Sequence, residues 1–146
     1  MPDHVLVPVD GSPLSFDALR HALREFPDAS ITVLHVIDLF DPDYGTADHT
    51  TYEPMLGSDE WYAQVEHHAD ELLDEATNLA ADNDREVETV SEIGEPGRII
   101  TDYVADESVD HVVIGAHGRP DAGRSLFGSV ATAVVRRAPV SVTLVR

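Results

Sequence analysis

Apolar residues recur along the chain in two alternating patterns. The first is a short continuous run, rich in β-branched residues and ended by turn residues, which is typical of a buried strand in a parallel sheet. Such runs cover residues 4–9, 31–37, 87–93, 111–114 and 140–145. The second pattern has helical spacing. It covers residues 14–26, 60–82, 99–104 and 127–137.

This alternation predicts an α/β fold. We expect an open five-stranded parallel sheet with helices on both faces, joined by right-handed crossovers. The 146 residues fit one domain, 1–146. Residues 38–59 show little periodicity and are predicted to form a long surface loop, of the kind that often serves as a lid. In such sheets ligands bind beyond the carboxyl ends of the strands, where the winding direction reverses.

The chain is strongly acidic, with 28 Asp and Glu against nine basic residues, all Arg, and a formal net charge of −19. This charge argues against nucleic acid as a partner. The acids are spread along the whole chain and Lys is absent, which favours a general adaptation to concentrated salt over a local patch for a basic partner. We therefore expect a halophilic protein.

The salt explanation predicts that stability rises as KCl increases from about 0.1 M into the molar range, because salt screens the repulsion between carboxylates. Thermal melting across a KCl series measures this. A protein that melts at the same temperature in dilute buffer as in molar salt would remove the salt explanation.

Other classes of function are excluded by what the sequence lacks. No apolar run approaches the roughly 20 residues that span a bilayer, and the N-terminus has no signal-peptide pattern. We therefore expect a cytoplasmic protein without a membrane partner. There is no cysteine, so disulfides, thiolate metal sites and a cysteine nucleophile are excluded.

The strongest candidate for chemistry is the glycine-rich segment 115–129, which follows a predicted strand and leads into a predicted helix. Glycines let the backbone approach a ligand, and the first amides of a helix attract anions. Arg119 and Arg124 make the segment basic, since Asp121 is its only acid. Ser129 is predicted to cap the helix. The segment therefore predicts a phosphate-binding loop, with a purely structural loop as the alternative.

One motif within the segment has the spacing of a Walker A loop, Gly118-x4-Gly123-Arg124-Ser125. Arg stands where that loop needs Lys, and a guanidinium does not replace the compact ammonium charge between phosphates. The motif also follows the fourth predicted strand, whereas a Walker A loop normally follows the first. We therefore prefer the overlapping frame Gly115-x2-Gly118-x9-Gly128-Ser129.

That frame is the pattern of the universal stress proteins, and the chain resembles this family over essentially its whole length. The resemblance implies a Rossmann-like fold of the adenine nucleotide alpha hydrolase type. It rests on four segments: Val5-Leu-Val-Pro-Val-Asp-Gly-Ser, Leu34-His-Val-Ile-Asp, Ile93-Gly-Glu-Pro and residues 115–129.

In ATP-binding members of the family, the matching residues surround the nucleotide. The resemblance implies that the end of the first strand and one residue of the second hold adenine and ribose, with Asp10 accepting from a ribose hydroxyl; these residues are Pro8, Val9, Asp10 and Val36. It implies that the phosphates, carrying a Mg²⁺ or Mn²⁺ ion, are surrounded by Gly115, His117, Gly118, Arg119, Gly128, Ser129 and Val130. The sequence departs from common versions at Ala116 and Ala131, often Ser and Thr, which puts two hydroxyl contacts in doubt.

Several of these residues have an alternative structural role. Asp10 is either a ribose ligand or a cap of the following helix. His117 either donates to a phosphate or only fixes the loop. Ser12 and Ser129 have no His and acid arranged as a triad and are predicted to be caps. The other seven histidines show no convergent metal spacing.

The leading hypothesis is a binding module, a homodimer that pairs through its last strand, Val140–Val145. It would take up ATP, change the order of the 38–59 loop and report nucleotide state to an unidentified protein partner in a stress response. No residue is an evident base for water, so hydrolysis should be slow or absent. The alternatives are a slow ATPase and a dimeric stress scaffold that binds no nucleotide.

Overall fold

The structure, a computed structural model, describes residues 2–39, 57–117 and 128–146. Strands and helices alternate along them, as the sequence predicted, and the predicted boundaries agree to within three residues. The elements are β1 (His4–Pro8), α1 (Pro13–Glu25), β2 (Ser30–Ile37), α2 (Asp59–Asp82), β3 (Glu88–Ile93), α3 (Pro96–Asp106), β4 (His111–Gly115), α4 (Ser129–Arg137) and β5 (Ser141–Val145). No helix in the described part is long and apolar enough to cross a membrane. Most of the predicted 38–59 loop lies outside the described residues.

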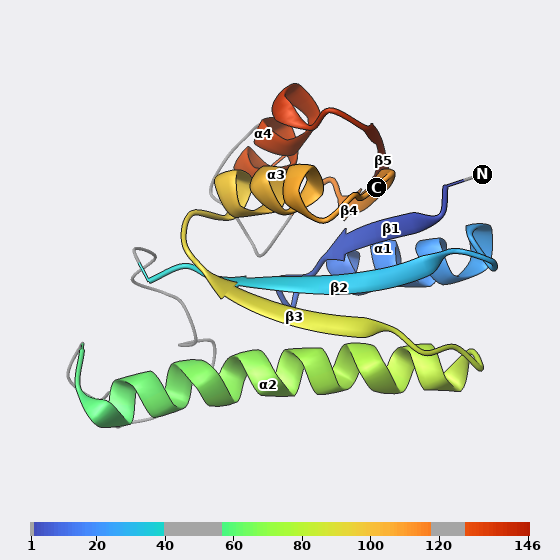
Figure 1. Cartoon of the computed structure of the whole chain (residues 1–146). Helices are drawn as coiled ribbons and strands as arrows, with labels where there is room; N and C mark the ends of the chain where they lie inside the picture. The colour runs from blue at the N-terminus through green and yellow to red at the C-terminus, as the bar shows by residue number, and fades with distance from the viewer. Residues whose placement is uncertain (1, 40–56, 118–127) are drawn as a thin grey trace.

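The five strands form one parallel sheet in the order β3-β2-β1-β4-β5. The chain places β2 and then β3 on one side of β1, and then crosses to place β4 and β5 on the other side (Figure 1). The open parallel sheet predicted from the sequence is therefore confirmed. Its winding direction reverses between β1 and β4, the place where such sheets bind ligands.

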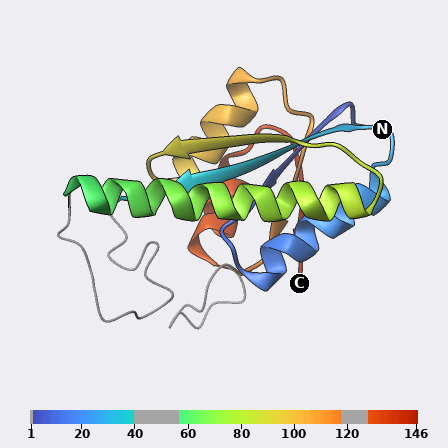
Figure 2. The ribbon, with the colours of Figure 1, turned by 90° about the horizontal axis from the view of Figure 1, so that it is seen from below.

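Helices cover both faces of the sheet. On one face, α1 and α2 pack over Val5, Val7 and Val33, and Figure 2 views the molecule from the side on which α2 lies. On the other face, α3 and α4 pack over Leu6 and Leu34 together with Val112. Successive residues of β1 thus point to opposite faces, and all of them except the half-buried His4 are buried, which is why the strand reads as a continuous apolar run.

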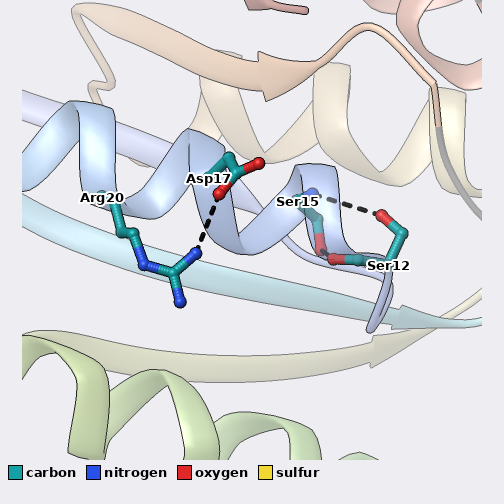
Figure 3. Close-up of polar contacts among 4 residues, drawn as sticks. All are labelled: Ser12, Ser15, Asp17 and Arg20. Carbon is teal, nitrogen blue, oxygen red and sulfur yellow. Dashed lines mark hydrogen bonds and ion pairs between the residues drawn. The ribbon is translucent and has the colours of Figure 1, made fainter.

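Helix α1 begins where local polar contacts fix its first turn (Figure 3). The Ser12 hydroxyl accepts a hydrogen bond from the Ser15 backbone N–H at 3.2 Å, as an N-cap does, and Pro13 follows as the first helical residue. Further along, the Arg20 guanidinium donates to Asp17 at 2.9 Å on the exposed side of the helix. The prediction that Ser12 is a cap is confirmed.

The amino edge of the sheet, opposite the predicted ligand edge, carries a half-buried histidine. The His111 ring hydrogen-bonds Thr143 Oγ1 of β5 at 2.7 Å and lies 5.0 Å from the Phe26 ring between centroids. Burial, and secondarily the charge of His21, lower the pKa of His111 below its ordinary value of 6.5. The neutral ring is therefore the form that the folded state prefers.

This pKa shift predicts that the fold loses stability as the pH falls below about 6.5, because the unfolded chain then binds a proton on His111 that the folded chain still excludes. Above that pH the contribution is fully present. Melting temperatures between about pH 7.5 and 5.5, above the main range of carboxylate titration, measure the loss. His111→Gln keeps a donor for Thr143 and should flatten this part of the profile; an unchanged profile would contradict the assignment.

Candidate functional site

The site predicted from the sequence lies where β1 and β4 reach the carboxyl edge of the sheet. The ladder between these strands joins Val5 to His111 and Leu6 to Val112, near their amino ends. The ladder between β1 and β2, in contrast, runs along the whole of β1. We call the residues beyond these two strand ends, together with the start of α4, the switch-point site: Asp10–Ser12, Ala116–His117 and Gly128–Ala131.

A backbone hydrogen bond joins the start of helix α4 to the end of β4. The Gly128 backbone N–H donates to the Ala116 carbonyl at 2.7 Å, which brings the start of the helix to the carboxyl edge of the sheet. Gly128 is the N-cap, with extended φ and ψ of −66° and 163°, and Ser129 is the first helical residue. The prediction that Ser129 caps the helix, and that the helix starts at residue 127, was therefore wrong. The bond to Ala116 holds Gly128 extended and sets the start of the helix.

The start of α4 differs from those of the other three described helices. The side chain of Ser12 caps α1, and that of Ser58 caps α2 by accepting from a backbone N–H of the first turn. The Glu95 carboxylate accepts from two N–H groups at the start of α3. Among the described residues, no side chain makes the corresponding hydrogen bond at the N-cap of α4, and the first turn of the helix contains no acid.

Three backbone N–H groups at this helix start, those of Ser129–Ala131, have no partner within the helix. The first intrahelical bond is donated by Thr132, whose N–H reaches the Gly128 carbonyl at 3.0 Å. The positive end of the helix dipole lies at the same place, and Arg136 and Arg137 stabilise its negative end in the last turn. The arrangement favours a bound anion.

The end of β1 contributes Pro8, Val9 and Asp10. Pro8 closes the strand opposite Leu34. Val9 is 3% exposed, and its side chain packs in the core on the α1 and α2 face. Asp10 is half-buried, and its Oδ1 accepts from the Ser12 N–H at 2.9 Å. The cap of α1 is Ser12, so the Asp10 carboxylate stabilises the turn that precedes the helix and does not cap the helix itself.

The remaining residues of the predicted site differ in exposure. Val36, near the end of β2, and Val130, in the first turn of α4, are half-buried and pack against the core on the α3 and α4 face. His117 is exposed just beyond β4. Ala116 and Ala131 are buried, with exposed fractions of 0% and 3%. The two positions at which the resemblance puts hydroxyl contacts in doubt are therefore closed, apolar positions in this chain.

Gly115 has a packing role that the sequence did not reveal. A Cβ atom at this position would lie 3.2 Å from the backbone carbon and oxygen of Leu14, in the first turn of α1. The absence of a side chain therefore lets α1 approach β4, whereas the sequence suggested that it lets the backbone approach a ligand. Gly118 and Arg119 lie outside the described residues, as do the other loop residues 120–127.

One residue near the site was missed by sequence reasoning. His35 is 2% exposed in β2, and its Nδ1 lies 2.8 Å from the Val9 carbonyl oxygen. The available signal was a single imidazole inside an otherwise apolar run, residues 31–37. From the sequence, His35 is weighed only as a metal ligand, which is why this contact was not predicted.

A separate groove lies between α2 and the β2–β3 edge of the sheet, with a volume of about 420 Å³. Glu66, Asp70 and Glu92 line it, so it repels phosphate and is no alternative anion site. Its other lining residues are Ile37, Ala69, Ser91 and Ile93. Within the described parts of the chain, no three His, Asp or Glu side chains are arranged to hold a metal ion.

A parallel sheet wound in both directions from β1, with an uncapped helix start beside the point of reversal, defines a doubly wound α/β protein with an anion-favouring edge. The model of the universal stress protein family matches residues 1–146. The chain belongs to this family.

Relatives agree with this assignment over nearly the whole chain. A universal stress protein of Methanocaldococcus jannaschii is 28% identical over 97% of this chain and 81% of its own length. A Staphylococcus aureus relative with the same family name is 31% identical, over 98% of this chain and 83% of its own. The solved structure of the universal stress protein UspA from Lactobacillus plantarum has a TM-score of 0.75 at 27% identity and covers 99% of this chain and 97% of its own.

Two further solved structures share the fold at lower identity. A universal stress protein in complex with cAMP has a TM-score of 0.70 at 22% identity, covering 99% of this chain and 97% of its own. A family member from Arabidopsis thaliana with AMP bound has a TM-score of 0.68 at 18% identity, covering 99% and 91%.

Proposed function

We propose that this chain binds ATP at the switch-point site and acts as a nucleotide-dependent regulatory dimer in a stress response. The observation that carries the proposal is the start of α4. It is joined to the end of β4 by the hydrogen bond from Gly128, no described side chain caps it, and its first amides have no partner within the helix.

The phosphates would be held by the backbone N–H groups of Ser129–Ala131, because these donors and the helix dipole act together on an anion. The residues flanking them would complete the phosphate site: Gly115, His117, Gly118, Arg119 and Gly128. A Mg²⁺ or Mn²⁺ ion would be held through phosphate oxygens.

Adenine and ribose would lie across the ends of β1 and β2. We propose that the backbone of Pro8 and Val9 and the side chain of Val36 line the base. Asp10 is half-buried at the edge of the sheet, and a carboxylate accepts hydrogen bonds from ribose hydroxyls. The same carboxylate accepts from Ser12, which would orient it before a ligand arrives.

Two family members with the same fold were solved with adenine nucleotides, cAMP and AMP. They support an adenine nucleotide as the ligand class. ATP in particular is favoured by the family resemblance of the 115–129 segment and by the number of amides left open at the start of α4. A triphosphate offers more oxygen acceptors to those amides than the single phosphate group of AMP or cAMP.

The dimer would pair through the last strand. β5 lies at one edge of the sheet, and Val142 and Leu144 on it are half-buried against the α3 and α4 core. A second copy pairing along Val140–Val145 would satisfy the open edge. At the other edge, the exposed carboxylates of Glu88 and Glu92 on β3 disfavour pairing.

The function is tested by purifying the protein in high salt, denaturing it and identifying any nucleotide that is released, followed by titration with Mg·ATP. We expect an adenine nucleotide in the released fraction and a saturable titration. ADP produced with turnover would make the protein an ATPase. No released nucleotide and no titration signal would leave a scaffold that binds none. Asp70→Asn, in the acidic groove, serves as a control that should bind as the unmodified protein does.

A further inference from the structure

His35 donates a hydrogen bond to the residue that precedes Asp10. Its Nδ1 lies 2.8 Å from the Val9 carbonyl oxygen, and the side chain is 2% exposed. A carbonyl only accepts, so the Nδ1 atom must carry the hydrogen. The contact therefore fixes both the orientation and the tautomer of the ring.

Val9 is held from both sides of its backbone by β2. Its N–H donates to the Leu34 carbonyl at 2.9 Å, and its carbonyl accepts from His35. The regular ladder between β1 and β2 ends at the pair Pro8 and Leu34. Beyond that pair the imidazole supplies a hydrogen bond that a backbone N–H would supply within a ladder, so the peptide between Val9 and Asp10 is fixed.

Helix α2 packs against His35 and against the turn that contains Asp10 and Gly11. The His68 ring contacts the His35 ring edge to face, with centroids 6.1 Å apart at 73°. One helical turn further, Leu72 Cδ2 lies 2.8 Å from the point where a Cβ on Gly11 would be. The His35 ring is thus packed between the sheet and α2, directly below the Asp10 turn.

We propose that His35 is a positioning residue for nucleotide binding: by donating from Nδ1 to Val9, it sets the Val9–Asp10 peptide and so the Asp10 carboxylate that accepts from ribose. The inference rests on the proposed function. It adds a residue to the site that touches no ligand and acts through the backbone.

The test uses two variants of His35 in the full-length protein. His35→Leu keeps a similar volume and removes the donor, whereas His35→Asn places an amide nitrogen at the same distance from Cβ as Nδ1. We expect Mg·ATP affinity, measured by calorimetry, to fall about tenfold in His35→Leu, the effect of losing one hydrogen bond. His35→Asn should bind within about threefold of the unmodified protein.

A matched control is His111→Leu, which removes the imidazole contact to Thr143 at the opposite edge of the sheet. It should lower the melting temperature without changing affinity. Affinity that is unchanged in His35→Leu, or lost equally in His35→Asn, would overturn the inference.

A second measurement tests the role of His35 even if no nucleotide binds or if His35→Leu does not fold. Long-range ¹H–¹⁵N spectra of the unmodified protein should show His35 with hydrogen on Nδ1. Hydrogen exchange of the Ser12 amide, which bonds Asp10, should be slower in the unmodified protein and in His35→Asn than in a folded His35→Leu. Hydrogen on Nε2 alone would overturn the positioning role. Absence of nucleotide binding together with hydrogen on Nδ1 would overturn the proposed function and leave the contact standing.

Discussion

Gly128→Asp should weaken binding of Mg·ATP roughly 30-fold or more while leaving the free energy of unfolding unchanged or slightly higher. Gly128 is the N-cap of α4, where Asp is among the preferred residues and exceeds Gly by a few tenths of a kcal/mol. The new carboxylate would accept from the amides of the first turn. These are the donors that we assign to phosphate, so stability and affinity should move in opposite directions.

Two effects of the carboxylate lower the affinity. It occupies one or two N–H groups of Ser129–Ala131, and hydrogen bonds to a charged group are each worth about 1.5–3 kcal/mol. It also repels the phosphate charge at a short distance. A factor of ten in Kd corresponds to about 1.4 kcal/mol. Calorimetric titration and chemical denaturation on the same samples measure both quantities.

Gly128→Asn is the matched control, because it has the same shape and capping ability without the charge. Its affinity should fall by less than that of Gly128→Asp. Equal affinities in both variants would show that charge at the helix start is irrelevant. An unchanged affinity in Gly128→Asp would contradict phosphate binding at α4 altogether.

Gly115→Val should cost about 2–3 kcal/mol of stability, a large share of what a domain of this size has. The first side-chain carbon would meet the Leu14 backbone at 3.2 Å, and the two methyl groups would force α1 away from β4. Urea denaturation measures the loss as a lower midpoint with an unchanged slope.

Two further variants test the reason for this cost. Gly115→Ala adds only the first carbon and should cost less, about 1 kcal/mol. Leu14→Ala should not rescue Gly115→Val, since the closest atoms belong to the Leu14 backbone. A Gly115→Val protein as stable as the unmodified one would contradict the packing role. The two glycines of one sequence motif are thus expected to act differently. Substitution of Gly115 should lower the stability of the fold, whereas substitution of Gly128 should lower the affinity for nucleotide.

The sequence predicted the elements and the fold class because local patterns determine them. The buried strands are short apolar runs, and the helices have regular apolar spacing ended by turn residues. That the candidate residues after β1 and β4 lie at the carboxyl edge also followed, since it depends only on the parallel arrangement. The order β3-β2-β1-β4-β5 did not follow, because strand pairing joins residues that are far apart along the chain.

The errors and omissions at the site have the same cause. Ser129 has the chemistry of a cap, but the bond from Gly128 to Ala116 decides where α4 begins. His35 finds its acceptor on Val9, 26 residues earlier. Both contacts depend on how separate elements meet, which a residue pattern within one segment does not contain.

The central claim, that phosphate is held at the start of α4, is tested most directly by ¹H–¹⁵N spectra recorded during titration with Mg·ATP. We predict saturable shifts at the amides of Ser129–Ala131 and at Asp10–Ser12, with no change in the groove at Glu66 and Asp70. Shifts confined to the groove, or a titration that leaves the amides of Ser129–Ala131 unchanged, would contradict the claim.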